Sequence, residues 1–535
     1  MKTLTSRVLT SLVWVFTNIA AKNAVQFTRN VILWRLLSRR EFGLNGMVWI
    51  AINGATLLQD LGFQAELIQR KKEIGGAISV TWYANVVIRS VIYVLLYFLS
   101  PLVAAHFREP EIQSLLQVAS LGIVVGAFGS ANEAMLRKNF QFKRLLVVEM
   151  VEMVTLTVAQ ILLAWHGLGV WSLVYGSIFS SLARSICLWW LAPIRLVGFN
   201  WRLAKEMLHF GKHMTISTLG LWFIKNMDYY FVGKFMGAAA LGVYTLAFKL
   251  SELIATNVVR SLASVFYPAF SEVAHDTERL RGGWLRALRY SMLVVTPMGV
   301  ALMLLSSEVI RSFYPGQEIA TVPMTILLLF SLCRGIGTPV GDLAKAINKP
   351  SILTRAVEIH ALLMGPTLYW ITSQWTPPIQ LDLMGPLNAV TVSNEWQGLL
   401  MGPVFHCAMG FWQPELEWGL IQVSIVVAVT PLFGLAVSLW LTSREVKFTA
   451  QQVLGALLPS AVSALFMAVS TLAFKWAWYA ALPGTPPLVV LLVLGPFSCI
   501  LYGLGLILFF PSVAADVRAL LGRGRSSKSN ARAPA

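Results

Sequence analysis

The chain has 535 residues, and its 42 Lys and Arg residues against 25 Asp and Glu residues give a formal net charge of +17. Hydrophobic residues make up 56% and charged residues only 13%, whereas soluble domains carry roughly 25% charged residues. This balance excludes a water-soluble globule, and the same hydrophobicity excludes a disordered chain. What remains is an integral membrane protein, because apolar runs of about 20 residues recur along the whole length.

The apolar runs are continuous and do not alternate with polar residues, which is typical of membrane helices and not of barrel strands. We therefore expect an all-α polytopic membrane protein with about 14 transmembrane helices, of which the first and seventh are longer than a bilayer requires. In chain order, the predicted spans are residues 8–36, 43–63, 77–103, 112–136, 144–165, 170–192, 206–236, 240–267, 284–306, 322–345, 352–370, 417–441, 451–477 and 487–511.

The distribution of Lys and Arg predicts the orientation, because cytoplasmic flanks of membrane helices are enriched in these residues. Cations concentrate on alternate flanks of the predicted spans, for example at 70–72, 137–144, 279–289 and beyond 511. We predict that these flanks and both termini lie in the cytoplasm, where the positive charge also attracts anionic membrane lipid. No nucleic-acid binding is expected, because no basic cluster is interleaved with aromatic residues on a soluble domain.

An internal repeat predicts two related lobes. Residues 33–44 resemble residues 232–243 at an offset of 199, and both copies place a cation eight residues before a glycine, Arg35 before Gly43 and Lys234 before Gly242. Six predicted spans separate the copies, so both have the same orientation, as in parallel repeats related by an axis along the membrane normal. We expect two pseudo-symmetric six-helix lobes around a central cavity, followed by two extra C-terminal helices.

The expected domain boundaries follow from the repeat and from the polar connectors. They are an N-lobe at 1–192, a cytoplasmic connector at 193–205, a C-lobe at 206–441, extra helices at 442–511 and a basic cytoplasmic tail at 512–535. Within the C-lobe, residues 371–416 form a predicted periplasmic insertion without Lys or Arg. The insertion contains Glu395, His406 and Cys407, but nothing at the spacing of a metal or catalytic site. We expect no metal and no cofactor.

Charged and polar residues inside the predicted spans fall on stripes, although each charge costs about 2.5–3.5 kcal/mol at the middle of a membrane helix. Their separations of three or four residues place them on one helix face. The first span carries Asn18, Lys22, Gln26 and Arg29, the eighth carries Lys249, Glu252 and Arg260, and the second and seventh add Asp60, Lys225 and Asp228. Four such stripes predict a hydrated, net-cationic cavity between the lobes.

Ion pairs within one helix are the alternative interpretation of these charges. Lys249 and Glu252 are three residues apart, as are Lys225 and Asp228, and side chains at this spacing are neighbours on a helix. This alternative does not explain Lys22 and Arg29, because neither has an acid on its own helix face.

Several stretches carry a family resemblance. They are 39–43 (RREFG), 60–71 (DLGFQAELIQRK), 225–228 (KNMD) with 233–237 (GKFMG) and 241–244 (LGVY), and 266–271 (FYPAFS). In this order they resemble the polysaccharide-transporter family, the oligosaccharide and lipopolysaccharide flippases of the multidrug/oligosaccharidyl-lipid/polysaccharide exporter superfamily. The likeness covers about 1–350 and, more loosely, 417–511. The insertion at 371–416 departs from the family pattern, in which a short turn joins the eleventh and twelfth helices.

The resemblance implies a transporter and not an enzyme. Such a protein would flip a polyprenyl-diphosphate-linked oligosaccharide across the bacterial inner membrane for lipopolysaccharide or exopolysaccharide biosynthesis, by alternating access. Its expected partners are the lipid-linked oligosaccharide and membrane lipid, with a polysaccharide polymerase and export machinery beyond them. A cationic, hydrated cavity suits this substrate, because Lys and Arg bind phosphate and the sugars cannot cross hydrocarbon unaided.

The expected roles of the site residues follow from this function. Lys22 and Arg29 are the predicted ligands of the diphosphate, and the remaining substrate-binding candidates are Asn18, Gln26, Lys225, Lys249 and Arg260. The candidates for ion coupling are Asp228, Glu252 and Asp60.

Two other functions compete with the flippase. A drug or small-metabolite antiporter of the same superfamily usually has twelve helices and a less cationic cavity. A membrane glycan polymerase or ligase needs a large outer loop with convergent catalytic groups, and the insertion at 371–416 lacks cations to hold a diphosphate donor.

Overall fold

The computed structural model describes residues 22–57, 59, 62–207, 222, 226–254, 259, 266–267, 269–349, 351–374 and 414–516. Within these ranges the regular elements are helices, and none is a strand. Eight of the described helices are long and apolar enough to span a membrane, or nine if a bent pair is counted as one span. The predicted all-α membrane class is therefore confirmed, while the number of fourteen spans stays a prediction.

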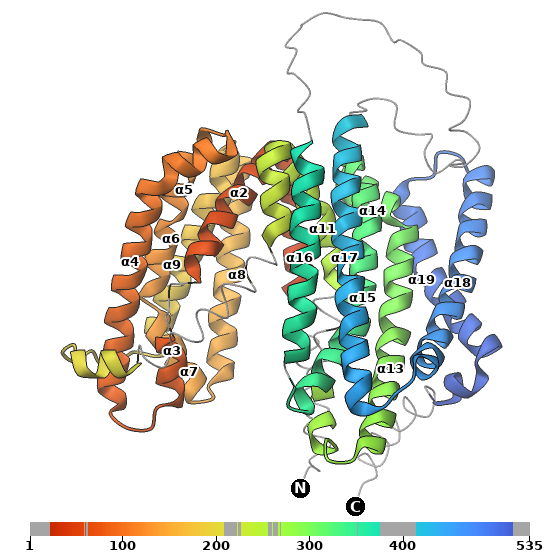
Figure 1. Cartoon of the computed structure of the whole chain (residues 1–535). Coiled ribbons are helices and arrows are strands. Elements are labelled where there is room, and N and C mark those ends of the chain that lie inside the picture. Colours follow the sequence, from red (N-terminus) through yellow and green to blue (C-terminus); the bar gives the residue numbers. More distant parts are fainter. Residues whose placement is uncertain are drawn as a thin grey trace, which may run out of the picture.

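Residues 22–207 form a first bundle (Figure 1). Its helices are residues 22–36, α2 (Arg39–Thr56), α3 (Phe63–Gln69), α4 (Ile74–Phe107), α5 (Glu111–Ala119), α6 (Leu121–Ala127), α7 (Ser130–Lys138), α8 (Phe142–Trp165) and α9 (Val170–Leu191). The span predicted at 112–136 is bent by 44° between Glu111–Ala127 and Ser130–Lys138.

The described residues between 226 and 446 form a second bundle, and two further helices flank it (Figure 1). The bundle contains η1 (Val232–Met236), α11 (Gly237–Ile254), α13 (Thr277–Leu304), α14 (Ser306–Phe313), η3 (Glu318–Ala320), α15 (Thr321–Ala346), α16 (Ser351–Ser373) and α17 (Pro414–Val446). The flanking helices are α18 (Ala450–Ala481) and α19 (Pro487–Phe509), which pack against α13 and α14. Most of the predicted insertion lies outside the described residues.

A buried ion pair attaches the flanking helices to the second bundle. Lys475 of α18 donates to the Glu308 carboxylate and to the Leu304 carbonyl of the second bundle, both at 2.9 Å, and Tyr479 donates to Glu308 at 3.0 Å. The Glu308 side chain is 3% exposed. Removal of one partner from such a pair would leave an uncompensated buried charge, so the pair holds α18 in place.

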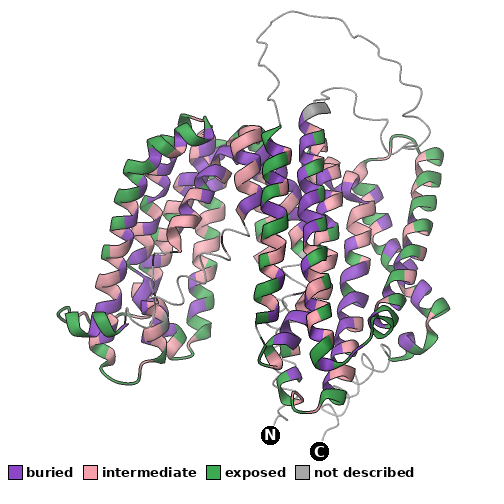
Figure 2. Ribbon diagram, in the orientation of Figure 1, coloured by how far each residue is buried: buried purple, intermediate pink, exposed green. Residues whose placement is uncertain are grey.

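Exposed residues follow the outer sides of the helices, as Figure 2 shows, and many of them are large and apolar. Phe98, Leu102, Trp190 and Leu492 each expose more than 60% of their surface. Exposed apolar areas of this extent are rare on soluble monomers. These side chains therefore face lipid, and the chain is an integral membrane protein.

The chain folds back on itself at Gly237. In an uninterrupted helix, 16 residues would rise about 24 Å, yet Tyr244 donates a hydrogen bond of 2.7 Å to the Asp228 carboxylate. Gly237 has φ of 85°, a value that favours glycine. The equivalent position in the first bundle, 199 residues earlier, is Ser38, which separates helix 22–36 from α2 and caps α2 through a reciprocal pair of hydrogen bonds with Glu41.

The two copies of the repeat touch each other where α2 crosses α11. A Cβ atom on Gly43 would lie 1.6 Å from the carbonyl oxygen of Ala238, and one on Gly242 would lie 2.1 Å from the carbonyl oxygen of Arg39. Adding 199 to 39 and 43 gives 238 and 242, so each contact is the pseudo-symmetric equivalent of the other. Small residues allow helix backbones in a membrane to approach this closely. We call this end of the molecule the convergent end, and the opposite end the divergent end.

Further contacts join the bundles at the convergent end. Arg35 donates to the Ser312 carbonyl at 3.3 Å, and Arg39 donates to the Gly316 carbonyl. His106 at the end of α4 hydrogen-bonds Tyr230 at 2.8 Å. One buried apolar cluster also extends across both bundles. The bundles are therefore packed together at this end.

A side chain at Gly43 should disrupt this contact. We expect Gly43→Leu to lower the melting temperature in detergent, because overpacking costs about 1–3 kcal/mol, and to lengthen the distance between spin labels at Ser114→Cys and Pro315→Cys. The control is Gly455→Leu, since a Cβ atom at Gly455 meets nothing within 4 Å. Equal effects of the two substitutions would show that the α2–α11 contact does not hold the bundles together.

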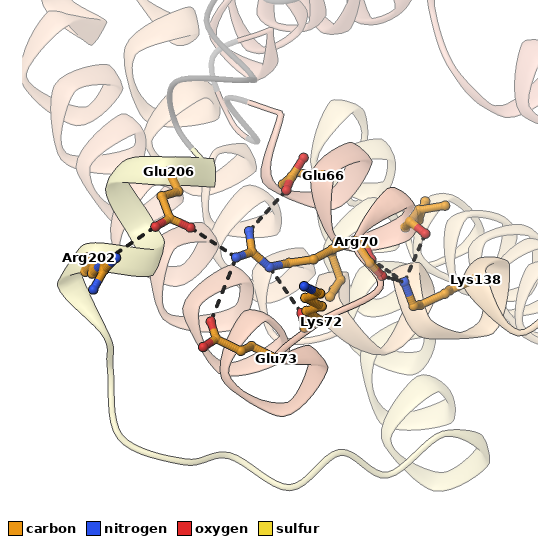
Figure 3. A network of polar contacts seen from close by, with 9 residues as sticks. Glu66, Arg70, Lys72, Glu73, Lys138, Arg202 and Glu206 are labelled. Atoms are coloured by element: carbon orange, nitrogen blue, oxygen red, sulfur yellow. Dashed lines mark hydrogen bonds and ion pairs between the residues drawn. The ribbon is translucent and has the colours of Figure 1, made fainter.

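At the divergent end, an ionic network attaches the predicted connector to the first bundle (Figure 3). Arg70 pairs with Glu66 at 3.2 Å and with Glu206 at 3.1 Å. Lys138 donates to the carbonyls of Leu67 and Ile68 at 2.9 and 3.0 Å, which are acceptors left free where α3 ends. The predicted connector is thus attached to the first bundle through Glu206.

Loss of Arg70 should loosen the connector. The Arg70 side chain is 16% exposed, and hydrogen bonds to a charged group contribute about 1.5–3 kcal/mol. We expect Arg70→Gln to lower the melting temperature by several degrees, whereas Lys71→Gln, which changes an exposed neighbour, should not. Proteolysis between 193 and 207 should also become faster only in Arg70→Gln, and identical cleavage of both variants would contradict this role.

Candidate functional site

The polar stripe of the first helix runs from Lys22 towards the convergent end. Lys22 lies 14 residues before the end of helix 22–36, or about 21 Å along its axis. It pairs with Glu149 of α8, and the two side chains are 32% and 33% exposed. Lys22 therefore has an acid partner after all, supplied by another helix and not by its own. Gln26, on the same stripe, is exposed.

Arg29 and Lys249 bring like charges together from the two bundles. Arg29 lies two turns above Lys22, and its Nε atom is buried without a hydrogen-bond partner in the described part of the chain. It acts electrostatically on Lys249 of α11, whose side chain is exposed. No ion pair is found for either cation among the described residues. Two neighbouring cations of this kind need water or an anion to be stable.

Glu252 of the second bundle has another partner than the sequence suggested. Glu252 pairs with Arg334 of α15 at 3.3 Å, and not with Lys249 one turn away. Asp228 is 3% exposed and accepts a hydrogen bond of 2.7 Å from Tyr244. The helical pairing considered for Lys249 and Glu252 is therefore wrong in this conformation, which leaves the Lys249 charge available.

A charge network on the first bundle escaped the sequence analysis. Arg184 of α9 bridges Glu133 of α7, at 2.8 Å, and Glu152 of α8, while Arg137 also pairs with Glu133 at 2.8 Å. The sequence contained one indication of such charge pairing, namely that Glu149 and Glu152 lie three residues apart in a predicted span. Their partners come from other helices and could not be read from the periodicity of one.

Four predicted site residues lie outside the described residues. They are Asn18, Asp60, Lys225 and Arg260. The roles predicted for them, including the pairing of Lys225 with Asp228, stay predictions.

A separate cavity of about 340 Å³ lies inside the second bundle between α15, α16 and α17. Arg334, Asp342 and Lys345 of α15 and His360 of α16 line it. Asp342 Oδ2 and His360 Nε2 are buried and have no hydrogen-bond partner within the described ranges. A cavity of this size and polarity suits water. The described residues contain no group of three or more His, Cys, Asp or Glu side chains that could hold a metal ion.

The exposure of Lys249 can be tested with a thiol probe. In a chain whose four native cysteines are replaced by serine, Lys249→Cys should react with a charged, membrane-impermeant thiosulfonate. Leu250→Cys should react at least about tenfold more slowly, because the wild-type leucine is 5% exposed and burial suppresses the reactive thiolate. Equal rates at the two positions would rule out a hydrated recess at Lys249.

The amino-acid sequence matches a known protein family. The sequence profile of the family described as "Polysaccharide biosynthesis protein" matches residues 32–323, more than half of the chain. The teichuronic acid biosynthesis protein TuaB of Bacillus subtilis is 24% identical over 69% of this chain and 77% of its own length. The lipopolysaccharide biosynthesis protein WzxC of Escherichia coli is 23% identical over 63% of this chain and 69% of its own.

A solved structure shares the fold. The lipid II flippase MurJ, in an inward closed conformation, superposes with a TM-score of 0.69 over 93% of this chain and 99% of its own, at 14% sequence identity. This similarity supports the two-bundle arrangement with additional C-terminal helices.

Proposed function

The chain belongs to the polysaccharide biosynthesis protein family, and from that premise we propose that it flips a polyprenyl-diphosphate-linked oligosaccharide across the membrane. The relatives named above are proteins of teichuronic acid and lipopolysaccharide biosynthesis, and the fold is that of a lipid II flippase. We propose that the protein transports its substrate and catalyses no bond-making reaction. Its partners are then the lipid-linked oligosaccharide and membrane lipid.

The observation that carries this proposal is the pair of cations at the junction of the two bundles. Arg29 and Lys249 repel each other, and neither has an ion pair in the described structure. A diphosphate supplies several negative oxygens, so one group can bind both cations at once. The sugars would occupy the hydrated space below, while the polyprenyl tail stays in lipid. A drug antiporter for cationic compounds would not favour two unpaired cations here.

The geometry also suggests how access alternates. The connector and the cations Arg70, Arg137 and Lys138 lie at the divergent end, which we assign to the cytoplasm by the enrichment of positive charge on that side. The termini then lie in the cytoplasm of a bacterial cell, and the convergent end faces outward. Because the Gly43 and Gly242 contacts close the convergent end, the structure corresponds to a carrier that is shut to the outside. Rocking of the bundles about this contact would expose the site outward.

Neutralising both junction cations should abolish export. Each charge-assisted contact is worth about 1.5–3 kcal/mol, so we expect Arg29→Gln and Lys249→Gln each to lower export about tenfold or more, and the double variant further. Charge reversal at Lys22 and Arg29 should abolish export as well. The measurement is the appearance of labelled glycan on the outer surface of cells, at equal amounts of protein in the membrane.

The control is Arg279→Gln, which changes a cation that is 80% exposed and pairs only with its neighbour Asp276 in the described structure. It should export normally. Normal export by the Arg29 and Lys249 double variant would exclude these cations from substrate binding.

A further inference from the structure

The ion pair between Lys22 and Glu149 joins the first helix to α8 across the first bundle. Each side chain is about one-third exposed, at 32% and 33%. In the view of Figure 1, α8 stands on the flank of the first bundle that faces α16. Lys22 is also on the stripe of Arg29, seven residues further along the same helix. Lys22, a predicted substrate ligand, is thus paired with an acidic residue of the protein itself.

We propose that Glu149 is an internal counter-ion that holds Lys22 in the empty carrier, and that the diphosphate of the substrate displaces it. This inference rests on the function proposed above. It assigns Glu149 a positioning role that none of the sequence motifs indicates.

The ion pair of Lys22 and Glu149 can separate at a small cost in free energy. A partly exposed ion pair has a small net free energy, because both charges keep water contacts in this conformation. No second partner of Glu149 is found among the described residues. By contrast, Glu152 one turn away binds Arg184, which is itself held by Glu133. The pair of Lys475 and Glu308 is 12% and 3% exposed and has further hydrogen bonds, so it is locked.

A diphosphate competes well against a single carboxylate at this place. Lys22 and Arg29 are two turns apart on one face, about 10 Å along the helix, and the charge of Lys249 in the other bundle acts on that of Arg29. Glu149 can satisfy only one of these cations. A substrate whose diphosphate binds Arg29 and Lys249 and whose outer oxygens reach towards Lys22 gains contacts that Glu149 cannot offer.

The counter-ion also serves the return of the empty carrier. When the bundles close without substrate, an unpaired Lys22 would be left uncompensated away from bulk water, which is costly. Glu149 neutralises it. Glu149 is unsuited to be the coupling carboxylate of a proton antiporter, because a proton taken up when substrate displaces it would travel outward together with the substrate. Its role is therefore electrostatic exchange.

The test compares Glu149→Gln with wild type in two measurements on the full chain. Binding of farnesyl diphosphate is followed by tryptophan fluorescence in detergent. Transport of a polyprenyl-diphosphate-linked sugar with a fluorescent label is followed in proteoliposomes. If Glu149 occupies Lys22 in nine of ten empty molecules, its removal should lower Kd about tenfold. Turnover should fall at the same time, because the empty carrier returns slowly, so KM and kcat decrease together.

Three further variants isolate the effect. Glu149→Gln in a Lys22→Gln background should leave Kd unchanged, because the counter-ion then has nothing to neutralise. The matched control Glu152→Gln removes an acid one turn away and should not tighten binding. The exchanged pair, Lys22→Glu with Glu149→Lys, should fold and keep its melting temperature but lose affinity, because the cation leaves the stripe of Arg29. It provides the test if Glu149→Gln alone is unstable.

The outcomes separate this inference from the proposed function. If Arg29→Gln and Lys249→Gln weaken farnesyl diphosphate binding but Glu149→Gln leaves Kd unchanged or raises it, the counter-ion role is wrong and the flippase proposal stands. Wild-type affinity of the exchanged pair would likewise reduce Lys22 and Glu149 to a structural contact. If wild type binds no farnesyl diphosphate, or if neither Arg29→Gln nor Lys249→Gln affects binding, both proposals fail together.

Discussion

The close approach of α2 and α11 is the constraint on which the rest of the arrangement depends. Gly43 and Gly242 let each backbone touch the carbonyl of the other helix, which no side chain would permit. The two contacts are equivalent under the 199-residue repeat, so they are related to each other by a local pseudo-twofold axis between the bundles. This arrangement places helix 22–36 and α11 at the same junction, so that the charge of Arg29 acts on that of Lys249 although they belong to different halves of the chain.

The charges within the bundles divide into those with partners and those without. Glu133, Glu152, Arg137 and Arg184 neutralise one another on the first bundle, and Glu308 with Lys475 attaches α18. Such pairs are compatible with a purely structural role. Arg29 and Lys249 are different, because neither has an ion pair within the described ranges and the charge of each disfavours that of the other. The uncompensated charge marks the place where a negative substrate group is needed, and Lys22, paired but partly exposed, stands between the two classes.

The hydropathy and the repeat predicted much of the fold. Three helices lie within a few residues of their predicted spans, at 142–165, 170–191 and 487–509. The helix at 74–107 is longer than its predicted span at both ends. The reversals at Ser38 and Gly237 fall in the gaps between predicted spans, whereas Gly43 and Gly242, expected to open the next helices, lie inside α2 and α11. The bend between α6 and α7 was not predicted, although the pair Gly129 and Ser130, of a kind often found at helix kinks, lies at it.

The sequence alone determined the membrane class, the approximate bounds of several described helices and the family, because hydropathy and short motifs are properties of neighbouring residues. Only the tertiary structure decided which charges are neutralised. Glu252 turned to Arg334 and not to Lys249, and Lys22 acquired Glu149 from a helix 127 residues away. The energy of an ion pair depends on the distance between two atoms and on the water around them. Both are set by how the helices pack and not by their separation along the chain.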